Sequence, residues 1–203
     1  MTDVIRSQNR AARGRIAPLL AGTAALLAAA LAHGATTEPP TPALRHLLIE
    51  AVHSSTSFKD RFDAEVWLMD MSGRLKTTIT DPRTRLRLLK AVHEEATRAH
   101  LPPNLVLAVI QVESNFDRFA ISQAGAEGLM QVMPFWLEVV GEPKANLFHL
   151  HTNLRLGCTI LRYYLDQAHG DYQKALARYN GSVGQRWYPD RVFRALETRW
   201  YRQ

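Results

Sequence analysis

The sequence contains a single cysteine, Cys158, among its 203 residues. No disulfide can therefore form within the chain, and the fold depends on its hydrophobic core. Cys158 lies in an apolar segment of helical periodicity. We interpret it as a small buried hydrophobic residue, and a thiol nucleophile is the less favoured alternative.

The sequence also lacks the sustained alternation of apolar and polar residues that is typical of half-buried strands, and it has no internal repeat. Apolar residues recur at helical spacing instead, and Asp81 followed by Pro82 is a strong helix start. We predict a mainly α fold with helices over about 43–70, 82–100, 103–114, 152–168 and 172–180. A short helix follows Pro134, and an amphipathic stretch covers about 188–200. Residues 72–80 are predicted to form a loop or a short extended piece.

No metal-binding pattern is present, because Thr97 stands where the second histidine of a zinc motif would be in HEEATRAH, residues 93–100. The histidines of HLH, residues 149–151, have no Cys or carboxylate cluster beside them. We predict no metal and no cofactor. No basic run with interleaved aromatic residues exists either, so a nucleic-acid partner is set aside.

One long apolar run occurs, Ile16 to Ala32, and it follows four arginines. This pattern favours a cleaved signal peptide over a retained membrane anchor within residues 1–34, with export to the periplasm in either case. Association with a membrane through residues 16–32 stays an alternative. Without residues 1–32 the formal net charge falls from +6 to +3, which suits a polyanionic partner such as cell wall or a membrane surface.

Glu113 follows a segment that is otherwise fit for a core. Leu105, Val109 and Val112 form one predicted buried stripe, and Glu113 continues it near the end of the helix. Burial and the helix dipole would both raise the pKa of this carboxyl group. A carboxyl group that is protonated near neutral pH suits a general acid for glycosidic bond cleavage. A bond from Glu113 to an adjoining turn explains the pattern equally well.

Three motifs resemble those of the soluble-type lytic transglycosylases, family 1: ESNF (113–116), SQAGAEGLMQVMP (122–134) and ALARYNGS (175–182). The resemblance covers about 85–195. It implies a lysozyme-like helical domain, here over 81–203, that acts on peptidoglycan. A linker over 35–43 and a helical N-terminal extension over 44–80 would precede this domain.

The resemblance also implies roles for individual residues. Glu113 matches the catalytic acid/base, and the matching substrate-binding residues are Ser122, Gln131, Met133, Tyr179 and Asn180. A buried Tyr179 hydroxyl would need a hydrogen-bond partner, and we expect Glu113 to be that partner. Gly125 and Gly128 would let the loop turn tightly beside the substrate. The third motif departs from the usual pattern, because Arg178 precedes the tyrosine and could add a positive charge near the mouth of the cleft.

The reaction implied is cleavage of the MurNAc-GlcNAc β-1,4 bond with formation of 1,6-anhydro-MurNAc ends by a single carboxyl group. Two alternatives stay open. The first is a lysozyme-type hydrolase with a second carboxylate, for which Asp117, Glu127 and Glu138 are candidates. The second is a protein that binds or assembles wall glycan with little turnover.

Overall fold

The computed structural model describes residue 42 and residues 61–201, including side chains from Trp67 onward. The predicted signal segment (1–34), most of the linker (35–43) and the first part of the extension lie outside the described residues. The helices are α2 (Arg61–Leu75), α3 (Pro82–Arg98), α4 (Pro103–Ser114), α5 (Phe135–Val139), α6 (Leu150–Gln167), α7 (Tyr172–Asn180) and α8 (Trp187–Ala195), which continues into a π-helical turn, η1 (Leu196–Trp200). Residues 61–201 contain no strand, only two isolated bridges around Glu127. The prediction of a mainly α fold is confirmed.

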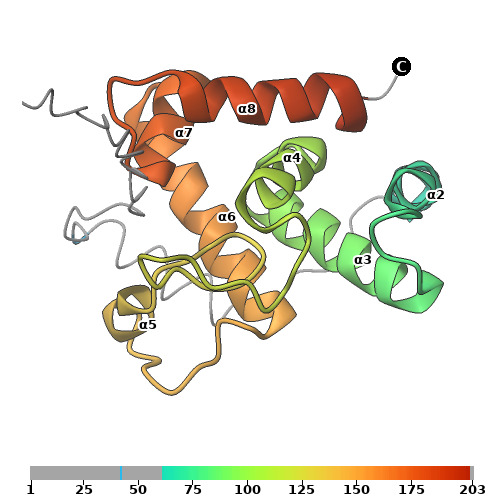
Figure 1. Ribbon diagram of the computed structural model, residues 1–203, viewed down its shortest axis with the longest axis horizontal. Helices are drawn as coiled ribbons and strands as arrows, with labels where there is room; N and C mark the ends of the chain where they lie inside the picture. The colour runs from blue at the N-terminus through green and yellow to red at the C-terminus, as the bar shows by residue number, and fades with distance from the viewer. Residues whose placement is uncertain (1–41, 43–60, 202–203) are drawn as a thin grey trace, which may run out of the picture. The chain divides into compact units, whose positions relative to one another are not determined.

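Helix α4 lies at the centre of the domain, with α3, α6 and α8 around it (Figure 1). Its residues from Leu105 to Ile110 are all 0–2 % exposed. The predicted stripe lies in the core, with Leu105 and Val109 buried and Val112 partly buried, and burial extends to the other faces of the helix because α3, α8 and η1 all pack against α4. The helix leaves the core only in its last turn, which holds Glu113.

The helix boundaries follow local chemistry. The Asp81 carboxylate accepts a 2.8 Å hydrogen bond from the backbone N–H of Thr84, and Pro82 opens α3, as predicted. Helix α7 ends at Gly181, whose φ of 80° is the left-handed conformation that glycine adopts without strain. Cys158 on α6 is fully buried, in agreement with its interpretation as a core residue.

Helix α2 falls within the predicted N-terminal extension (44–80) and runs one turn further than predicted. The sequence places a loop from residue 72, yet the helix continues to Leu75. Met71 and Leu75 are both fully buried, and α2 packs against α3 and η1. Burial of these side chains outweighs the poor helix propensity of Gly73 within the last turn.

Two arginines join α2 to η1 near the C-terminal end of the described chain. Arg74 donates to the carbonyl of Arg199 at 2.8 Å, and Arg199 donates to the carbonyl of Arg74 at 2.9 Å. Trp67 donates to Asn104, which in turn donates to the carbonyl of Trp200. These bonds connect α2, the start of α4 and η1. No helix within residues 61–201 has the length and apolar character needed to cross a membrane.

Candidate active site

Glu113 lies in the last turn of α4, where the helix emerges from the core. The helix ends because Asn115 adopts a left-handed conformation with a φ of 48°. The hydroxyl of the neighbouring Ser114 donates to the carbonyl of Leu129 at 2.9 Å, which fastens this turn to the loop over residues 120–134. The Glu113 side chain is half-buried. Its carboxyl group is thus held in place while one side of the residue stays open to solvent.

Tyr188 is the direct hydrogen-bond partner of this carboxyl group. Its hydroxyl donates to Oε1 of Glu113 at 2.5 Å, and its side chain is only 1 % exposed. The sequence analysis missed this residue. A signal existed, because Tyr188, Val192 and Ala195 form the buried face of α8, and a tyrosine on such a face needs a partner for its hydroxyl.

The pKa of Glu113 is raised from its ordinary value of 4.5 to about 7. Burial is the largest cause, because it disfavours the charged form. The hydrogen bond from Tyr188 and the positive charge of Arg191 oppose the rise and lower the pKa by smaller amounts. Burial, reinforced by the charge of Glu113, raises the pKa of Tyr188 well above its ordinary value, so this hydroxyl remains a donor.

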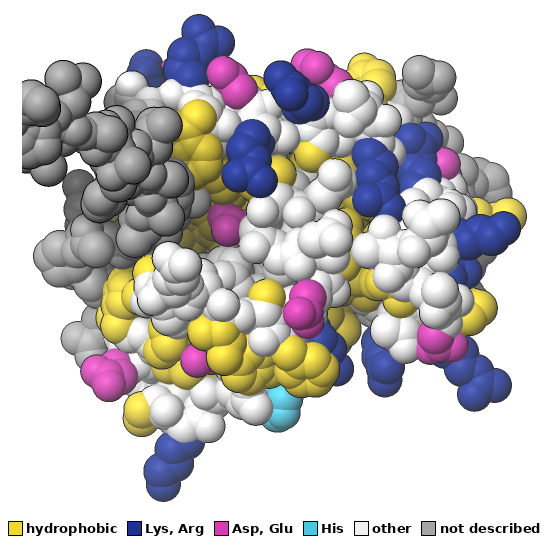
Figure 2. All heavy atoms as spheres, in the orientation of Figure 1, with side chains coloured by type: hydrophobic (Ala, Val, Ile, Leu, Met, Phe, Trp, Pro, Cys, Tyr) yellow, Lys and Arg dark blue, Asp and Glu magenta, His cyan; other side chains and the backbone are white. Residues whose placement is uncertain are grey.

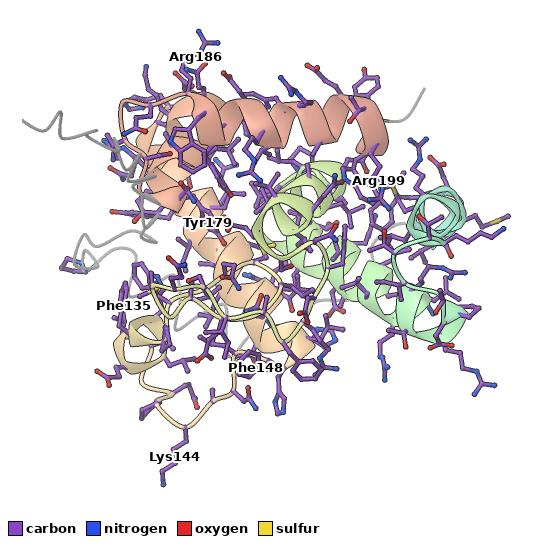
Figure 3. The ribbon with its side chains drawn as sticks, viewed as in Figure 1. Phe135, Lys144, Phe148, Tyr179, Arg186 and Arg199 are labelled. Carbon is purple, nitrogen blue, oxygen red and sulfur yellow. The ribbon has the colours of Figure 1, made fainter. Side chains whose placement is uncertain are left out.

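Tyr179 occupies the buried face of α7, but its expected bond to Glu113 was wrong. The Tyr179 hydroxyl donates instead to the carbonyl of Met130 at 2.7 Å. Burial is the main cause that raises its pKa, and the charge of Glu113 adds to the rise, so the two groups are close enough to interact. Figure 3 shows Tyr179 on the side of α7 that faces the centre of the domain. Met130 takes this bond because its carbonyl, within the irregular loop, needs a donor.

Ser122 and Gln131 hold the loop over residues 120–134 in shape. The Ser122 hydroxyl accepts a 3.0 Å bond from the N–H of Ala126. The side-chain amide of Gln131 donates to the carbonyls of Ala120 and Gly128 at 3.1 and 2.9 Å. Both side chains are half-buried. In the structure they brace the backbone of the loop, and contact with a substrate remains a prediction.

Asn153 of α6 is bonded to the same loop by two hydrogen bonds, and this residue was not predicted from the sequence either. Its side chain accepts from the N–H of Met130 and donates to the carbonyl of Glu127, both at 2.8 Å. Gly128 has a φ of 75°, and a Cβ atom there would lie 2.4 Å from Nδ2 of Asn153. The predicted need for glycine in this turn is confirmed, and its main reason is the close approach of α6.

Met133 and Asn180 are the remaining residues predicted to bind the substrate. Met133 is half-buried and packs against the hydrophobic core. Asn180 is the last residue of α7, and its buried Oδ1 atom accepts no hydrogen bond from the described residues. An unpaired buried oxygen is costly, so this atom is suited to accept a bond from a bound hydroxyl or amide group.

The other candidate carboxylates differ from Glu113 in their surroundings. Asp117 is exposed and accepts a 2.9 Å bond from the N–H of Phe119, which is a turn-capping role. Glu138 is exposed on α5, and Glu127 is half-buried, with its backbone in the two isolated bridges.

One group of side chains has metal-ligand character within the described residues: Glu94, Glu95 and His151. The Glu95 carboxylate is fully buried, and it already accepts bonds from Arg98 at 2.8 Å and from Arg155 at 2.9 Å. The guanidinium groups of Arg98 and Arg155 therefore already neutralise the negative charge of Glu95, which a metal ion would need for its binding. The group fits a structural ion-pair network between α3 and α6.

The site thus combines one carboxyl group of raised pKa, a tyrosine that donates to it and a rigid loop beside it. Such a carboxyl group is partly protonated near neutral pH, and its Oε2 atom is not used by the bond from Tyr188. This arrangement is capable of proton donation to a substrate oxygen followed by proton uptake. It offers one such group, whereas most glycoside hydrolases use two.

Comparison with known proteins gives matches that name one class of enzyme. The family model described as Transglycosylase SLT domain matches residues 90–198. The chain is 32 % identical over 118 residues to a transglycosylase of Enterobacteria phage PRD1, covering 55 % of this chain and 43 % of that protein. It is 33 % identical over 145 residues to the membrane-bound lytic murein transglycosylase C of Histophilus somni (strain 2336), covering 55 % and 40 %.

Among solved structures, the chain resembles an inactive mutant of the lytic transglycosylase Slt from Pseudomonas aeruginosa. The identity is 29 % and the TM-score is 0.43, over 55 % of this chain and 21 % of that one. The chain spans less than half the length of the curated relatives that it matches. The residues that the family model matches, 90–198, include Glu113, the loop over 120–134, Tyr179 and Tyr188. Helix α2 lies outside this range.

Proposed function

The chain belongs to the transglycosylase SLT family, and on that premise we propose that it is a lytic transglycosylase of peptidoglycan. The bond cleaved is the β-1,4 bond between MurNAc and GlcNAc, and the products carry 1,6-anhydro-MurNAc ends. The observation that carries the proposal is the Glu113 carboxyl group, whose pKa of about 7 keeps it partly protonated near neutral pH.

In the proposed reaction, Glu113 acts first as an acid and then as a base. Its carboxyl proton moves to the glycosidic oxygen as the bond from that oxygen to C1 of MurNAc breaks. The 6-hydroxyl of the same MurNAc then bonds to C1, and its proton returns to the Glu113 carboxylate. Atoms and charges balance without water or a cofactor, and the N-acetyl group of the sugar can assist at C1.

Tyr188 would keep the Glu113 carboxyl group in one orientation through both steps. Its hydroxyl donates to Oε1, which leaves Oε2 as the atom that carries the transferred proton. Asn180 offers its unpaired Oδ1 to a sugar hydroxyl or amide, and Met133 offers an apolar wall. Ser122 and Gln131 contribute by holding the loop that lines the glycan.

The surroundings of Asp117 argue against the hydrolase alternative. A second carboxylate would have to approach the sugar together with Glu113 and activate a water molecule. Asp117 is exposed and already caps the turn at Phe119. We therefore assign it to the local structure of the segment that follows α4.

We further propose that the chain works in the periplasm after export by its N-terminal segment. The apolar run from Ile16 to Ala32 with its preceding arginines supports export. Peptidoglycan strands are the proposed partner, and residues 16–32 are a possible point of contact with the membrane. The division into a linker over 35–43, an extension over 44–80 and a transglycosylase domain over 81–203 is part of the same proposal.

Mass spectrometry of muropeptides released from purified sacculi tests the proposed reaction. The chain should release anhydro products that are about 18 Da, one water, lighter than the hydrolytic products, and the Glu113→Gln variant should release none. Reducing-end products would instead identify a hydrolase. Binding of sacculi by both proteins without any release would identify a glycan-binding protein.

A further inference from the structure

A concave region lies on the outer side of α7, and Glu113 is not among the residues that line it. A cavity of about 360 Å³ is enclosed by the outer face of α7 and by the loop that leads to α8. Its charged lining residues are Lys174, Arg178 and Arg186, and none of its eight lining residues is acidic. We call this cavity the α7 outer pocket. Figure 2 shows Lys and Arg side chains over α7 and α8 at the top of the view, and Figure 3 shows Arg186 projecting from the outside of the domain there.

The cations of the α7 outer pocket are not neutralised by strong partners. The Arg178 side chain is exposed and makes no hydrogen bond or ion pair within residues 61–201. Lys174 pairs with Asp171 at 3.0 Å, and Arg186 lies 3.8 Å from Asp190. Exposed pairs of this kind hold their partners weakly, so both cations remain able to turn toward an anion.

The neutral residues that line the pocket favour a ligand with a hydrogen-bond acceptor attached to an aliphatic chain. The side-chain oxygen of Gln185 already accepts a 2.7 Å bond from Trp187, which leaves its NH₂ group as a donor. Ala177 and Val183 add an apolar wall, and Val183 is 63 % exposed. A carboxylate on a short aliphatic chain matches this lining better than a bare phosphate does.

We propose that the α7 outer pocket binds carboxylate groups of the peptide stems of peptidoglycan, with Arg178 as the principal contact. This inference rests on the proposed function, because the stems are attached to the MurNAc units that Glu113 would act on. Tyr179 and Asn180 follow Arg178 directly on α7, so the pocket and the proposed glycan site share one helix end. A helix is about 10 Å across, and four extended residues span about 13 Å, so a stem can pass around the end of α7.

Binding to two forms of the wall tests the proposal without relying on catalysis. The full chain carrying Glu113→Gln is sedimented with intact sacculi and with glycan strands freed of peptides by an amidase. Adding Arg178→Ala should weaken binding to intact sacculi by roughly three- to tenfold, the scale of one lost charge-assisted contact, and leave binding to peptide-free glycan unchanged. Arg178→Lys should recover part of the loss. Lys144→Ala, which removes an exposed cation on another loop, is the matched control and should change neither.

Equal binding of the starting protein to both materials, or no binding to either, would overturn the proposal. An equal loss on both materials with Arg178→Ala would do the same, because it would indicate a general contact with the glycan. The outcome is separable from the proposed function. Release of anhydro products by a chain with no stem preference would leave the proposed reaction standing and contradict the stem site alone. A stem preference in a chain that releases no product would contradict the proposed reaction alone.

Discussion

The hydroxyl of Tyr188 donates a 2.5 Å hydrogen bond to Oε1 of Glu113, which joins the first turn of α8 to the last turn of α4. This bond stabilises the charged form of Glu113, whereas burial stabilises the neutral form. Burial is the larger effect, and the pKa settles at about 7. Removal of the hydrogen bond from Tyr188 should therefore raise the pKa of Glu113 further.

Tyr188→Phe should shift the loss of activity at alkaline pH to a higher pH. The acid must be protonated, so activity falls as pH rises through the pKa of Glu113. Loss of a hydrogen bond to a carboxylate raises that pKa by about one unit. The measurement is the pH profile of muropeptide release. Tyr179→Phe is the matched control, because its hydroxyl bonds to Met130 and not to Glu113. A shift of the same size in both variants would contradict the specific role of Tyr188.

Glu113→Gln should make the fold less sensitive to pH. In the wild type, burial favours protonated Glu113. The contribution of this group to the unfolding free energy is therefore fully present below pH 4.5 and is lost as the pH rises toward and through 7. The loss from this group is roughly 3 kcal/mol, the equivalent of a shift from 4.5 to about 7. The amide of the variant stays neutral, so the variant should be the more stable protein at pH 8. Thermal unfolding at pH 4 and pH 8 measures the stability of both proteins. An equal loss of stability in wild type and variant between the two pH values would contradict burial of the carboxyl group.

Gly128→Ala should destabilise the domain far more than Gly125→Ala. Both glycines have a positive φ, which costs an alanine roughly 1 to 2 kcal/mol. A Cβ atom at Gly125 meets nothing within 4 Å, while one at Gly128 would collide with Asn153 and with the carbonyl of Leu147. The added overpacking brings the expected loss at Gly128 to roughly 2 to 5 kcal/mol. Denaturant unfolding compares the two variants, and equal losses would mean that α6 does not approach the loop closely.

Met71→Ala tests whether α2 is part of the folded domain. Met71 is fully buried, and its truncation should cost roughly 2 to 5 kcal/mol of unfolding free energy. Met69 lies on the same helix and is 79 % exposed, so Met69→Ala should change stability by less than about 0.5 kcal/mol. If denaturant unfolding finds both variants near wild type, α2 does not pack against α3 and η1 in solution.

The sequence predicted the helices well where their ends carry chemical signals. Asp81, Pro82 and Gly181 mark boundaries that the structure confirms, because capping and φ preferences act within a few residues. The end of α2 was wrong, because the burial of Leu75 depends on contacts with distant helices. The stripe on α4 is in the core as predicted, but the residues between its members are buried as well. A periodic pattern does not reveal how many neighbours a central helix has.

The candidate site shows the same division. The three motifs predicted Glu113 and the loop beside it, since their residues lie close together in sequence. Tyr188 lies 75 residues from its partner, and no local pattern connects the two. Asn153 likewise reaches the loop from α6 through two hydrogen bonds. The predicted hydrogen-bond partner of Tyr179 was wrong. Two buried tyrosines, Tyr179 and Tyr188, lie near the Glu113 carboxyl group, and the packing of α7 and α8 determines which hydroxyl bonds to it.

The titration of Glu113 itself tests the central claim, that burial keeps this carboxyl group partly protonated near neutral pH. Carbon-13 NMR of the glutamate side-chain carboxyl groups, with Glu113→Gln to identify the resonance, follows its ionisation directly. We expect a midpoint of about 7. A midpoint near the ordinary value of 4.5 would contradict it, because Glu113 would then be ionised at neutral pH and unable to serve as the acid.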